Sequence, residues 1–335
     1  MSYKIAFFGS QPYDKASFKR INEEFGFDLR FYKGNINANN IVLTEGCDAV
    51  CIFVNDDANE EILQGLANNG VKILALRCAG YNNVDLKAAE KHNIKVVRVP
   101  AYSPYAVAEH TVALMLALNR RIPRATWRTR DGNFSLDGLL GFDMHGKTAG
   151  IIGTGKIAKI LIQILKGFGM NIIANDLYPD HKFAEEVGMR YVTLDELYQE
   201  ADIISLHCPL TDDTKYVIND YSISKMKDGV MIINTGRGQL INTNSLIAGL
   251  KSKKIGWAGL DVYEEEGEYF YQDKSNRIID DDVLARLLSF NNVIVTSHQA
   301  FFTEEALGNI AHTTLQNIKD FHDNKELVNQ VTLNS

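Results

Sequence analysis

The chain has 335 residues, enough for about two domains, each able to bury a core without disulfides or a metal. Hydrophobic residues make up 45% and charged residues 23%, as in globular proteins, and the net charge of −7 without a long basic run argues against nucleic acid or an anionic membrane as a partner. The longest apolar stretch, residues 112–118, is far shorter than the ~20 residues of a membrane-spanning helix.

The cysteines, Cys47, Cys51, Cys78 and Cys208, form no Cys-x-x-Cys pair and no cluster with histidine. Three of them lie in or beside apolar strand-like runs, so we expect buried reduced thiols and no metal site. The N-terminal sequence MSYKIAFFGS is typical of a first strand, because it lacks the cationic start, apolar run and cleavage site of a signal peptide. These features favour a cytoplasmic protein.

The first part of the chain alternates short apolar strands with polar helices. The predicted strands are residues 4–8, 28–32, 49–54, 72–76 and 95–99. The predicted helices between several of them are residues 14–25, 59–68 and 85–92. Such alternation is typical of βαβ units, which build a parallel sheet.

A break at residues 99–104, VPAYSP, precedes a long helix predicted over residues 105–119. Pro104 suits the first turn of this helix. The second half of the helix is apolar on nearly every side, so we expect it to be buried in the core or against a second subunit. We interpret the break as the first hinge between two domains.

A second alternating series starts at Lys147. Its predicted strands are residues 148–152, 171–174, 202–207, 230–234, 256–261 and 292–296. After them, Thr303 followed by two glutamates predicts the start of a last helix, which would return the chain to the first domain. The fold class is therefore α/β, with two Rossmann-like or flavodoxin-like parallel-sheet domains and a cleft between them. Residues 1–102 plus 300–335 would form one domain and residues 103–299 the other.

The segment AGIIGTGKIA, residues 149–158, matches the pattern G-x-G-x-x-A between a predicted strand and a predicted helix. Gly153 would allow the tight turn, Gly155 would let the backbone approach a pyrophosphate, and Ala158 is small enough for helix and strand to pack. The start of the helix would offer free N–H groups to the phosphates. A lone glycine motif is weak evidence, because the glycines could serve the turn only.

The position of Asp176 strengthens the nucleotide interpretation. Asp176 ends the next predicted strand, 23 residues after Gly153, close to the spacing of about 20 in dinucleotide-binding motifs. Its carboxylate would accept hydrogen bonds from ribose hydroxyls and repel a 2′-phosphate, and no arginine follows immediately. The sequence thus favours NAD over NADP as the cofactor.

Three later strands are each followed by a charged side chain, at the edge where open α/β sheets bind ligands. Arg237 stands between two glycines, and its guanidinium could clamp a carboxylate with two parallel hydrogen bonds. Residues 264–266 are three glutamates, and His298 ends the last strand. Taken singly, Arg237 could be a surface residue, the acids a solvated loop and His298 a core residue.

Together these groups supply what reduction of a 2-oxo acid requires. The cofactor would carry the hydride, and Arg237 would hold the substrate carboxylate. His298 would give a proton to the developing alkoxide, or remove it in the reverse direction. An acid would orient the imidazole and favour its protonated form. The residues alone do not separate Glu264, Glu265 and Glu266 for this role.

At these residues the chain resembles the D-isomer-specific 2-hydroxyacid dehydrogenase family over nearly its whole length. The resemblance is carried, in chain order, by LRCAGYNNVDL, VPAYSPYAVAEHT, GIIGTGKIA, HCPLT, NTGRG, the acidic run from Asp261, and SHQAFFT. Ala158 replaces a common glycine, and Gly236 stands where relatives often carry serine or alanine. Gln299 and the aromatic residues 269–271 favour the lactate branch of the family.

The resemblance implies a role for each site residue. Arg237, Glu266 and His298 would be catalytic, with Glu264 and Glu265 as spectators. Substrate contacts would come from the backbone N–H groups of Ala79 and Gly80 and from Tyr102 and Phe301. Cofactor contacts would come from Gly153, Gly155, Lys156, Ile157, Asp176, His207, Cys208, Pro209, Thr214, Thr235, Gly236, Arg237 and Asp261. Residues 103–299 would bind NAD, and the discontinuous domain would bind the substrate.

The activity implied by the resemblance is the reversible reduction of pyruvate to D-lactate with NADH, a fermentation reaction, in a homo-oligomer that is a dimer or a tetramer. Glycerate, phenyllactate or branched 2-hydroxy acids stay open as substrates, because an apolar pocket separates substrates differing by one methylene only ~10–200-fold. An alternative of another class is an NAD-sensing binding protein, since transcriptional corepressors resembling this family retain the fold and the triad.

Overall fold

The protein is described here by a computed structural model, which covers residues 3–333 apart from the side chain of Glu268. Contacts divide the chain into two compact units. Unit 1 comprises the residues up to Ser103 and from Phe302 onward, and unit 2 comprises Pro104–Phe301. These divisions lie one and two residues from the domain boundaries expected from the sequence. Among residues 3–333, no helix has the length and apolarity needed to cross a membrane.

Unit 1 contains a six-stranded sheet in the order β13-β5-β4-β3-β1-β2. The strands are β1 (Lys4–Phe7), β2 (Asp28–Phe31), β3 (Ala49–Ile52), β4 (Ile73–Leu76), β5 (Lys95–Val97) and β13 (Gln330–Val331). The first five are parallel and follow the flavodoxin order 2-1-3-4-5. The exception is β13, which pairs antiparallel with β5 and was not predicted.

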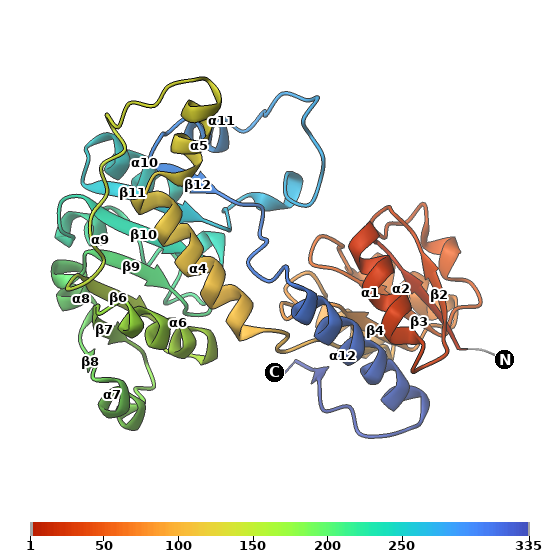
Figure 1. The fold of residues 1–335 in the computed structure, drawn as a ribbon. Coiled ribbons are helices and arrows are strands. Elements are labelled where there is room, and N and C mark those ends of the chain that lie inside the picture. Colours follow the sequence, from red (N-terminus) through yellow and green to blue (C-terminus); the bar gives the residue numbers. More distant parts are fainter. Residues whose placement is uncertain (1–2, 334–335) are drawn as a thin grey trace. The chain divides into compact units, whose positions relative to one another are not determined.

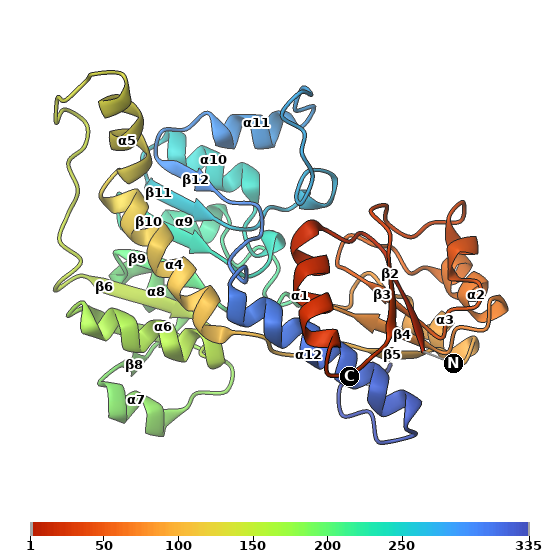
Figure 2. The same cartoon turned by 45° about the vertical axis from the view of Figure 1, so that its right-hand side comes forward.

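Helices cover both faces of this sheet. They are α1 (Pro12–Asn22), the short 3₁₀ helix η1 (Ile41–Thr44), α2 (Glu60–Asn68), α3 (Leu86–Lys91) and α12 (Glu304–His322). The two helices α1 and α12, far apart in sequence, lie side by side on one face (Figures 1 and 2). Alternate strand residues face opposite layers: Phe7 packs on Phe18 of α1, whereas Phe8 joins the cluster that contains Leu63 of α2.

Unit 2 contains a seven-stranded parallel sheet in the order β12-β11-β10-β9-β6-β7-β8. The strands are β6 (Thr148–Ile152), β7 (Asn171–Asn175), β8 (Arg190–Tyr191), β9 (Ile203–Leu206), β10 (Val230–Asn234), β11 (Ile255–Leu260) and β12 (Val293–Val295). The chain runs outward from β6 to β8 and then returns to place β9 on the other side of β6. This reversal creates the switch point at which such sheets bind dinucleotides. The predicted class, two parallel-sheet α/β domains, is confirmed.

Helices also cover both faces of the sheet in unit 2. They are α4 (Pro104–Asn119), α5 (Ile122–Arg130), α6 (Lys156–Gly167), α7 (His181–Val187), α8 (Leu194–Glu200), α9 (Asp220–Lys225), η2 (Gly238–Leu240), α10 (Thr243–Lys251), η3 (Glu266–Glu268) and α11 (Asp282–Leu288). The apolar helix α4 packs on α6, β10 and β11, with Met115 and Leu118 buried (Figure 1). The apolar residues of α4 are therefore explained by their burial in the core of unit 2.

The segment after α4 exposes a group of large apolar side chains instead. Arg121 adopts a left-handed conformation with φ of 54° and turns the chain into α5. Trp127 of α5 and, beyond it, Phe134, Leu136 and Leu140 are each at least 65% exposed. The apolar residues of this segment do not follow a helical or strand period, so the sequence gives no sign of it.

Candidate active site

The loop after β6 and the loop after β9 touch at the switch point of unit 2. Gly153 has a φ of +89°, and a Cβ there would lie 2.5 Å from the backbone nitrogen of Cys208 and 2.7 Å from the carbonyl carbon of His207. Only glycine fits a backbone contact this close. At Gly155, by contrast, a Cβ would meet nothing within 4 Å. The first glycine is thus required by the protein itself, and the second leaves open space over the start of α6.

This open space suits the pyrophosphate of a dinucleotide. Helix α6 begins at Lys156, directly after Gly155, and no side chain caps its first turn. Its first N–H groups are therefore available to an anion, and the helix dipole adds partial positive charge. Ala158 is fully buried, as expected for the small residue that lets helix and strand pack. The donors and the space present in the protein fit NAD.

Asp176 directly follows β7 and is held in place by hydrogen bonds. Its Oδ2 atom accepts from the backbone N–H and, at 2.8 Å, from the hydroxyl of Thr154, and its Oδ1 atom accepts from the N–H of Tyr178 at 2.8 Å. Partial burial opposes ionisation, but these hydrogen bonds and Lys159 outweigh it and lower the pKa of the carboxyl. Asp176 is thus a charged acceptor suited to ribose hydroxyls. The contact from Thr154 was not predicted from the sequence.

Arg237 stands in a tight turn after β10. The buried side chain of Asn234 shapes this turn, donating to the carbonyl of Arg237 at 2.8 Å and accepting from the N–H of Gly236 at 3.0 Å. The guanidinium is exposed, and its Nη1 atom donates to the carbonyl of Gly236 at 2.9 Å. Its remaining donors are suited to binding a carboxylate in the forked manner of arginine.

His298 and Glu266 form a close pair. The Nδ1 atom of His298 lies 2.7 Å from Oε1 of Glu266, and the other carboxylate oxygen accepts from the N–H of Tyr263 at 3.0 Å. The side chains of His298 and Glu266 are 20% and 26% exposed. The carboxylate keeps a proton on Nδ1, so Nε2 is the nitrogen that can exchange a proton with a substrate.

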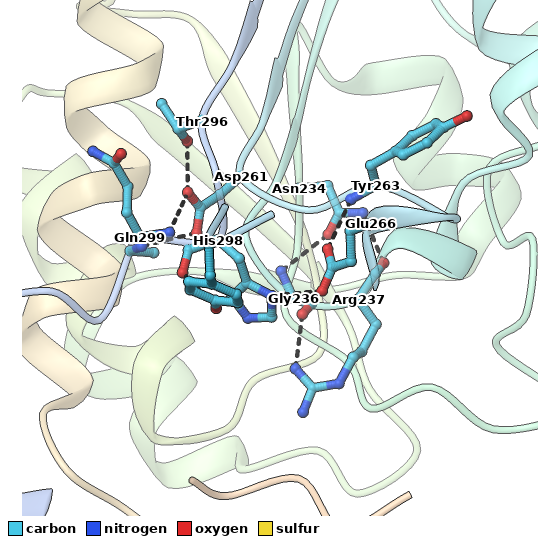
Figure 3. Close-up of polar contacts among 11 residues, drawn as sticks. Asn234, Gly236, Arg237, Asp261, Tyr263, Glu266, Thr296, His298 and Gln299 are labelled. Carbon is cyan, nitrogen blue, oxygen red and sulfur yellow. Dashed lines mark hydrogen bonds and ion pairs between the residues drawn. The ribbon is translucent and has the colours of Figure 1, made fainter. Parts of the chain in front are cut away.

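The structure separates the glutamates that the residue pattern alone left open. Glu264 accepts hydrogen bonds from the hydroxyl of Tyr216 at 2.7 Å and from the N–H of Thr243 at 2.8 Å, so it joins loops instead of facing His298. Of the three glutamates 264–266, Glu266 is the one that contacts the imidazole. Figure 3 shows the guanidinium of Arg237 and the ring of His298 on the same side of the strand ends.

Asp261, directly after β11, builds the turn that carries His298. Its fully buried carboxylate accepts from the N–H groups of Gln299 and Ala300 at 2.9 and 2.8 Å and from the hydroxyl of Thr296 (Figure 3). Within this turn His298 has a φ of 52°, a conformation that L residues rarely adopt. Burial opposes ionisation of Asp261, but hydrogen bonds from His110 and Thr296 outweigh it and lower its pKa.

Comparison with known proteins decides the family. Residues 112–300 match the model of the D-isomer specific 2-hydroxyacid dehydrogenase, NAD binding domain. The chain is 52% identical over 328 residues to D-lactate dehydrogenase from Escherichia coli, covering 98% of this chain and 99% of that protein. The chain belongs to the D-isomer specific 2-hydroxyacid dehydrogenase family. It is therefore an NAD-dependent dehydrogenase.

Two further comparisons agree with this assignment. This dehydrogenase is 54% identical over 328 residues to a 2-hydroxyacid dehydrogenase homolog from Haemophilus influenzae, covering 98% of this chain and 99% of that protein. The solved structure of apo D-lactate dehydrogenase from E. coli matches it with a TM-score of 0.91 at 50% identity, covering 98% of this chain and all of the other.

Several other predicted cofactor residues of this dehydrogenase lie on the loops around the switch point. His207 and Cys208 form the turn that touches Gly153. Burial lowers the pKa of His207 to about 4 and raises the pKa of Cys208 to about 11, so both are neutral at pH 7. Pro209 is exposed, and its carbonyl accepts from the hydroxyl of Thr214 at 2.6 Å. The hydroxyl of Thr214 thus stabilises its own turn, and its cofactor contact stays a prediction.

The remaining predicted cofactor residues lie near the start of α6 and the end of β10. Lys156 and Ile157 form the first turn of α6, with Lys156 exposed. The hydroxyl of Thr235 lies 3.0 Å from that of Thr111 on α4, which itself donates to a backbone carbonyl. The hydroxyl of Thr235 therefore donates to Thr111, and this bond holds the side chain of Thr235 in place.

The predicted substrate residues are divided between the two units. Phe301 is buried at the end of unit 2. In unit 1, the carbonyl of Ala79 accepts from Arg98 at 2.8 Å, that of Gly80 from the thiol of Cys78 at 3.3 Å, and that of Tyr102 from Asn309 at 2.7 Å. These bonds fix the backbone of each residue, and the substrate contacts stay predictions.

Proposed function

We propose that this dehydrogenase reduces pyruvate to D-lactate with NADH and catalyses the reverse reaction. The observation that carries the proposal is the arrangement of Arg237, Glu266 and His298, which follow β10, β11 and β12, three neighbouring strands whose carboxyl ends share one sheet edge. The identity of 52% to the D-lactate dehydrogenase of E. coli over nearly the whole chain supports pyruvate as the substrate.

Each of the three residues would have one task. The guanidinium of Arg237 binds the pyruvate carboxylate through two parallel hydrogen bonds. NADH, when bound, supplies the hydride that reduces the carbonyl carbon. His298 donates the proton on Nε2 to the carbonyl oxygen as negative charge develops there, and it removes that proton from lactate in the reverse direction. Glu266 holds the imidazole in place through Nδ1.

We assign the remaining roles on the basis of the resemblance. Unit 2 is the NAD-binding domain and unit 1 the substrate domain. The backbone N–H groups of Ala79 and Gly80 assist Arg237 in binding the carboxylate, and Tyr102 and Phe301 contact the rest of the substrate. Pyruvate is favoured over phosphorylated substrates because the sequence shows no additional basic cluster near these residues.

The test is to measure NADH oxidation by the whole protein with a panel of 2-oxo acids, followed by chiral analysis of the product. We expect the highest kcat/KM with pyruvate and D-lactate as the product. A higher value with hydroxypyruvate, phenylpyruvate or a branched 2-oxo acid would move the assignment to another member of the family. Tight NADH binding without any turnover would favour the NAD-sensing alternative.

We further propose that the protein is a cytoplasmic homo-oligomer whose reaction regenerates NAD during fermentation. The free thiols of all four cysteines support a reducing compartment. The exposed side chains of Trp127, Phe134, Leu136 and Leu140 support self-association, because large apolar side chains gathered on one exposed segment favour burial against a partner. Light scattering of the wild type and of Leu140→Glu tests this: we expect a dimer or tetramer that the variant weakens, and a monomeric wild type would refute it.

A further inference from the structure

We propose that Tyr191 helps to set the preference for NAD over NADP by positioning Asp176 through the hydroxyl of Thr154. Tyr191 forms the two-residue strand β8 together with Arg190. It is not among the residues expected to contact the cofactor. Its action would be indirect, so Tyr191 is a positioning residue.

The proposal rests on a chain of three hydrogen bonds that ends at the carboxylate. The N–H of Asp180 donates to the hydroxyl of Tyr191 at 3.0 Å. The hydroxyl of Tyr191 lies 2.9 Å from the hydroxyl of Thr154. The hydroxyl of Thr154 lies 2.8 Å from Oδ2 of Asp176.

The chemistry of these groups fixes the direction of every bond. Asp176 is charged because its pKa is lowered, so its carboxylate only accepts hydrogen bonds. Thr154 has a single hydroxyl proton and must donate it to Asp176. Tyr191 must therefore donate to Thr154, while its own oxygen accepts from the Asp180 N–H. All donors thus point toward Asp176, and each bond polarises the next.

Tyr191 is itself held rigidly at the start of this chain. Its backbone pairs with Ala174 of β7, the strand that leads to Asp176. The ring of His181 meets its ring edge-on, with 5.7 Å between centroids. Asp180 caps α7 by accepting from Phe183 at 3.1 Å and also pairs with Lys159. The short strand β8, which lies at the edge of the sheet (Figure 1), therefore holds the phenol beside Thr154 in the loop after β6.

A fixed carboxylate at position 176 discriminates between the two cofactors. It must stay in place to accept hydrogen bonds from the ribose hydroxyls of NAD. A 2′-phosphate at the same position brings like charges together, and the repulsion increases as their separation decreases. If Asp176 turns more freely, it binds the hydroxyls less well and can move away from a 2′-phosphate. Loosening Asp176 thus weakens NADH binding and relieves the penalty against NADPH.

The test compares the dissociation constants of NADH and NADPH, measured by calorimetry on the whole protein. Tyr191→Phe removes only the hydroxyl. We expect the ratio of the NADPH constant to the NADH constant to fall by about 2- to 10-fold, the effect of losing one net hydrogen bond. Thr154→Val should lower the ratio at least as much, whereas Thr154→Ser keeps the hydroxyl and should retain most of the preference.

Tyr198→Phe is the matched control. The hydroxyl of Tyr198 is also part of unit 2, but it donates to the carbonyl of Val217 at 2.9 Å and has no contact with Asp176. We expect this variant to lower the melting temperature without changing the ratio. A Tyr191→Phe protein that loses thermal stability but keeps the wild-type ratio would show that Tyr191 is merely structural and would overturn the proposal. A wild type that binds NADPH as tightly as NADH would overturn it as well.

Discussion

Two glycines of the phosphate loop should respond to the same substitution in opposite ways. In Gly153→Ala the new Cβ would lie 2.5 Å from the backbone nitrogen of Cys208, and the residue would keep a φ of +89°. Left-handed backbone costs an L residue about 1–2 kcal/mol, and overpacking costs about 1–3 kcal/mol, so we expect unit 2 to lose about 2–5 kcal/mol of stability. At roughly 2–4 °C for each kcal/mol, its melting temperature should fall on the order of 10 °C.

In Gly155→Ala the new Cβ meets no protein atom within 4 Å, so the stability should change by less than about 1 kcal/mol. The methyl group would instead occupy the space over the start of α6 and keep the pyrophosphate from its N–H donors. Hydrogen bonds to a charged group contribute about 1.5–3 kcal/mol, so NADH affinity should fall about 10- to 150-fold.

Thermal unfolding and calorimetric titration with NADH measure the two effects separately. Gly167→Ala, at the exposed last residue of α6 with no neighbour within 4 Å of its Cβ, is the control and should leave NADH affinity unchanged. Wild-type NADH affinity in Gly155→Ala would refute the location of the pyrophosphate. Wild-type stability in Gly153→Ala would refute the close contact between the two loops.

Three further predictions concern His298, Arg237 and His207. His298→Ala should lower kcat by about 10²–10⁴-fold with NADH affinity retained, and equal turnover in both proteins would remove His298 from the reaction. Arg237→Lys should raise KM for pyruvate, because an ammonium cannot form the two parallel bonds, and steady-state kinetics with an unchanged KM and kcat would contradict this. Burial lowers the pKa of His207 from 6.5 to about 4. Between these two pH values the unfolded chain binds a proton at His207 that the folded protein does not bind. The free energy of unfolding therefore falls as the pH drops from 6.5 to 4. In His207→Gln, the loss of unfolding free energy between pH 7.5 and pH 5 should be smaller than in the wild type by about 2 kcal/mol. Urea unfolding at both pH values measures this, and an equal loss in the variant and the wild type would contradict the prediction.

The sequence predicted the elements whose pattern is local and long enough to recognise. The strands β6 and β10 lie at the predicted residues, and α12 begins with the expected cap, in which the side chain of Thr303 accepts from the N–H of Ala306. The strands β8 and β13 were missed, because two residues cannot display a period of two. Their positions depend on partners far along the chain, as the pairing of Tyr191 with Ala174 illustrates.

In the candidate site, too, the sequence predicted only those residues whose signal is local in the chain. Arg237 and His298 stand out because each is a charged or ionisable residue within three positions of the end of an apolar strand. The residue pattern leaves the choice among the three glutamates open, and the family resemblance implies Glu266. The fold shows the reason, because Glu264 bonds to Tyr216 and Glu266 to His298. The contact of Thr154 with Asp176 joins residues 22 positions apart and has no sequence signal of its own.

The residues assigned to proton exchange and carboxylate binding, Arg237, Glu266 and His298, all belong to unit 2, as does Asp261, which shapes the histidine turn. All side chains assigned to the chemical step therefore lie in one of the two units. With unit 1 as the proposed substrate domain, substitutions in it should change which 2-oxo acid is accepted without altering how its carbonyl is reduced. On that assignment, new substrate preferences would arise from changes in unit 1 while the chemistry stays in unit 2.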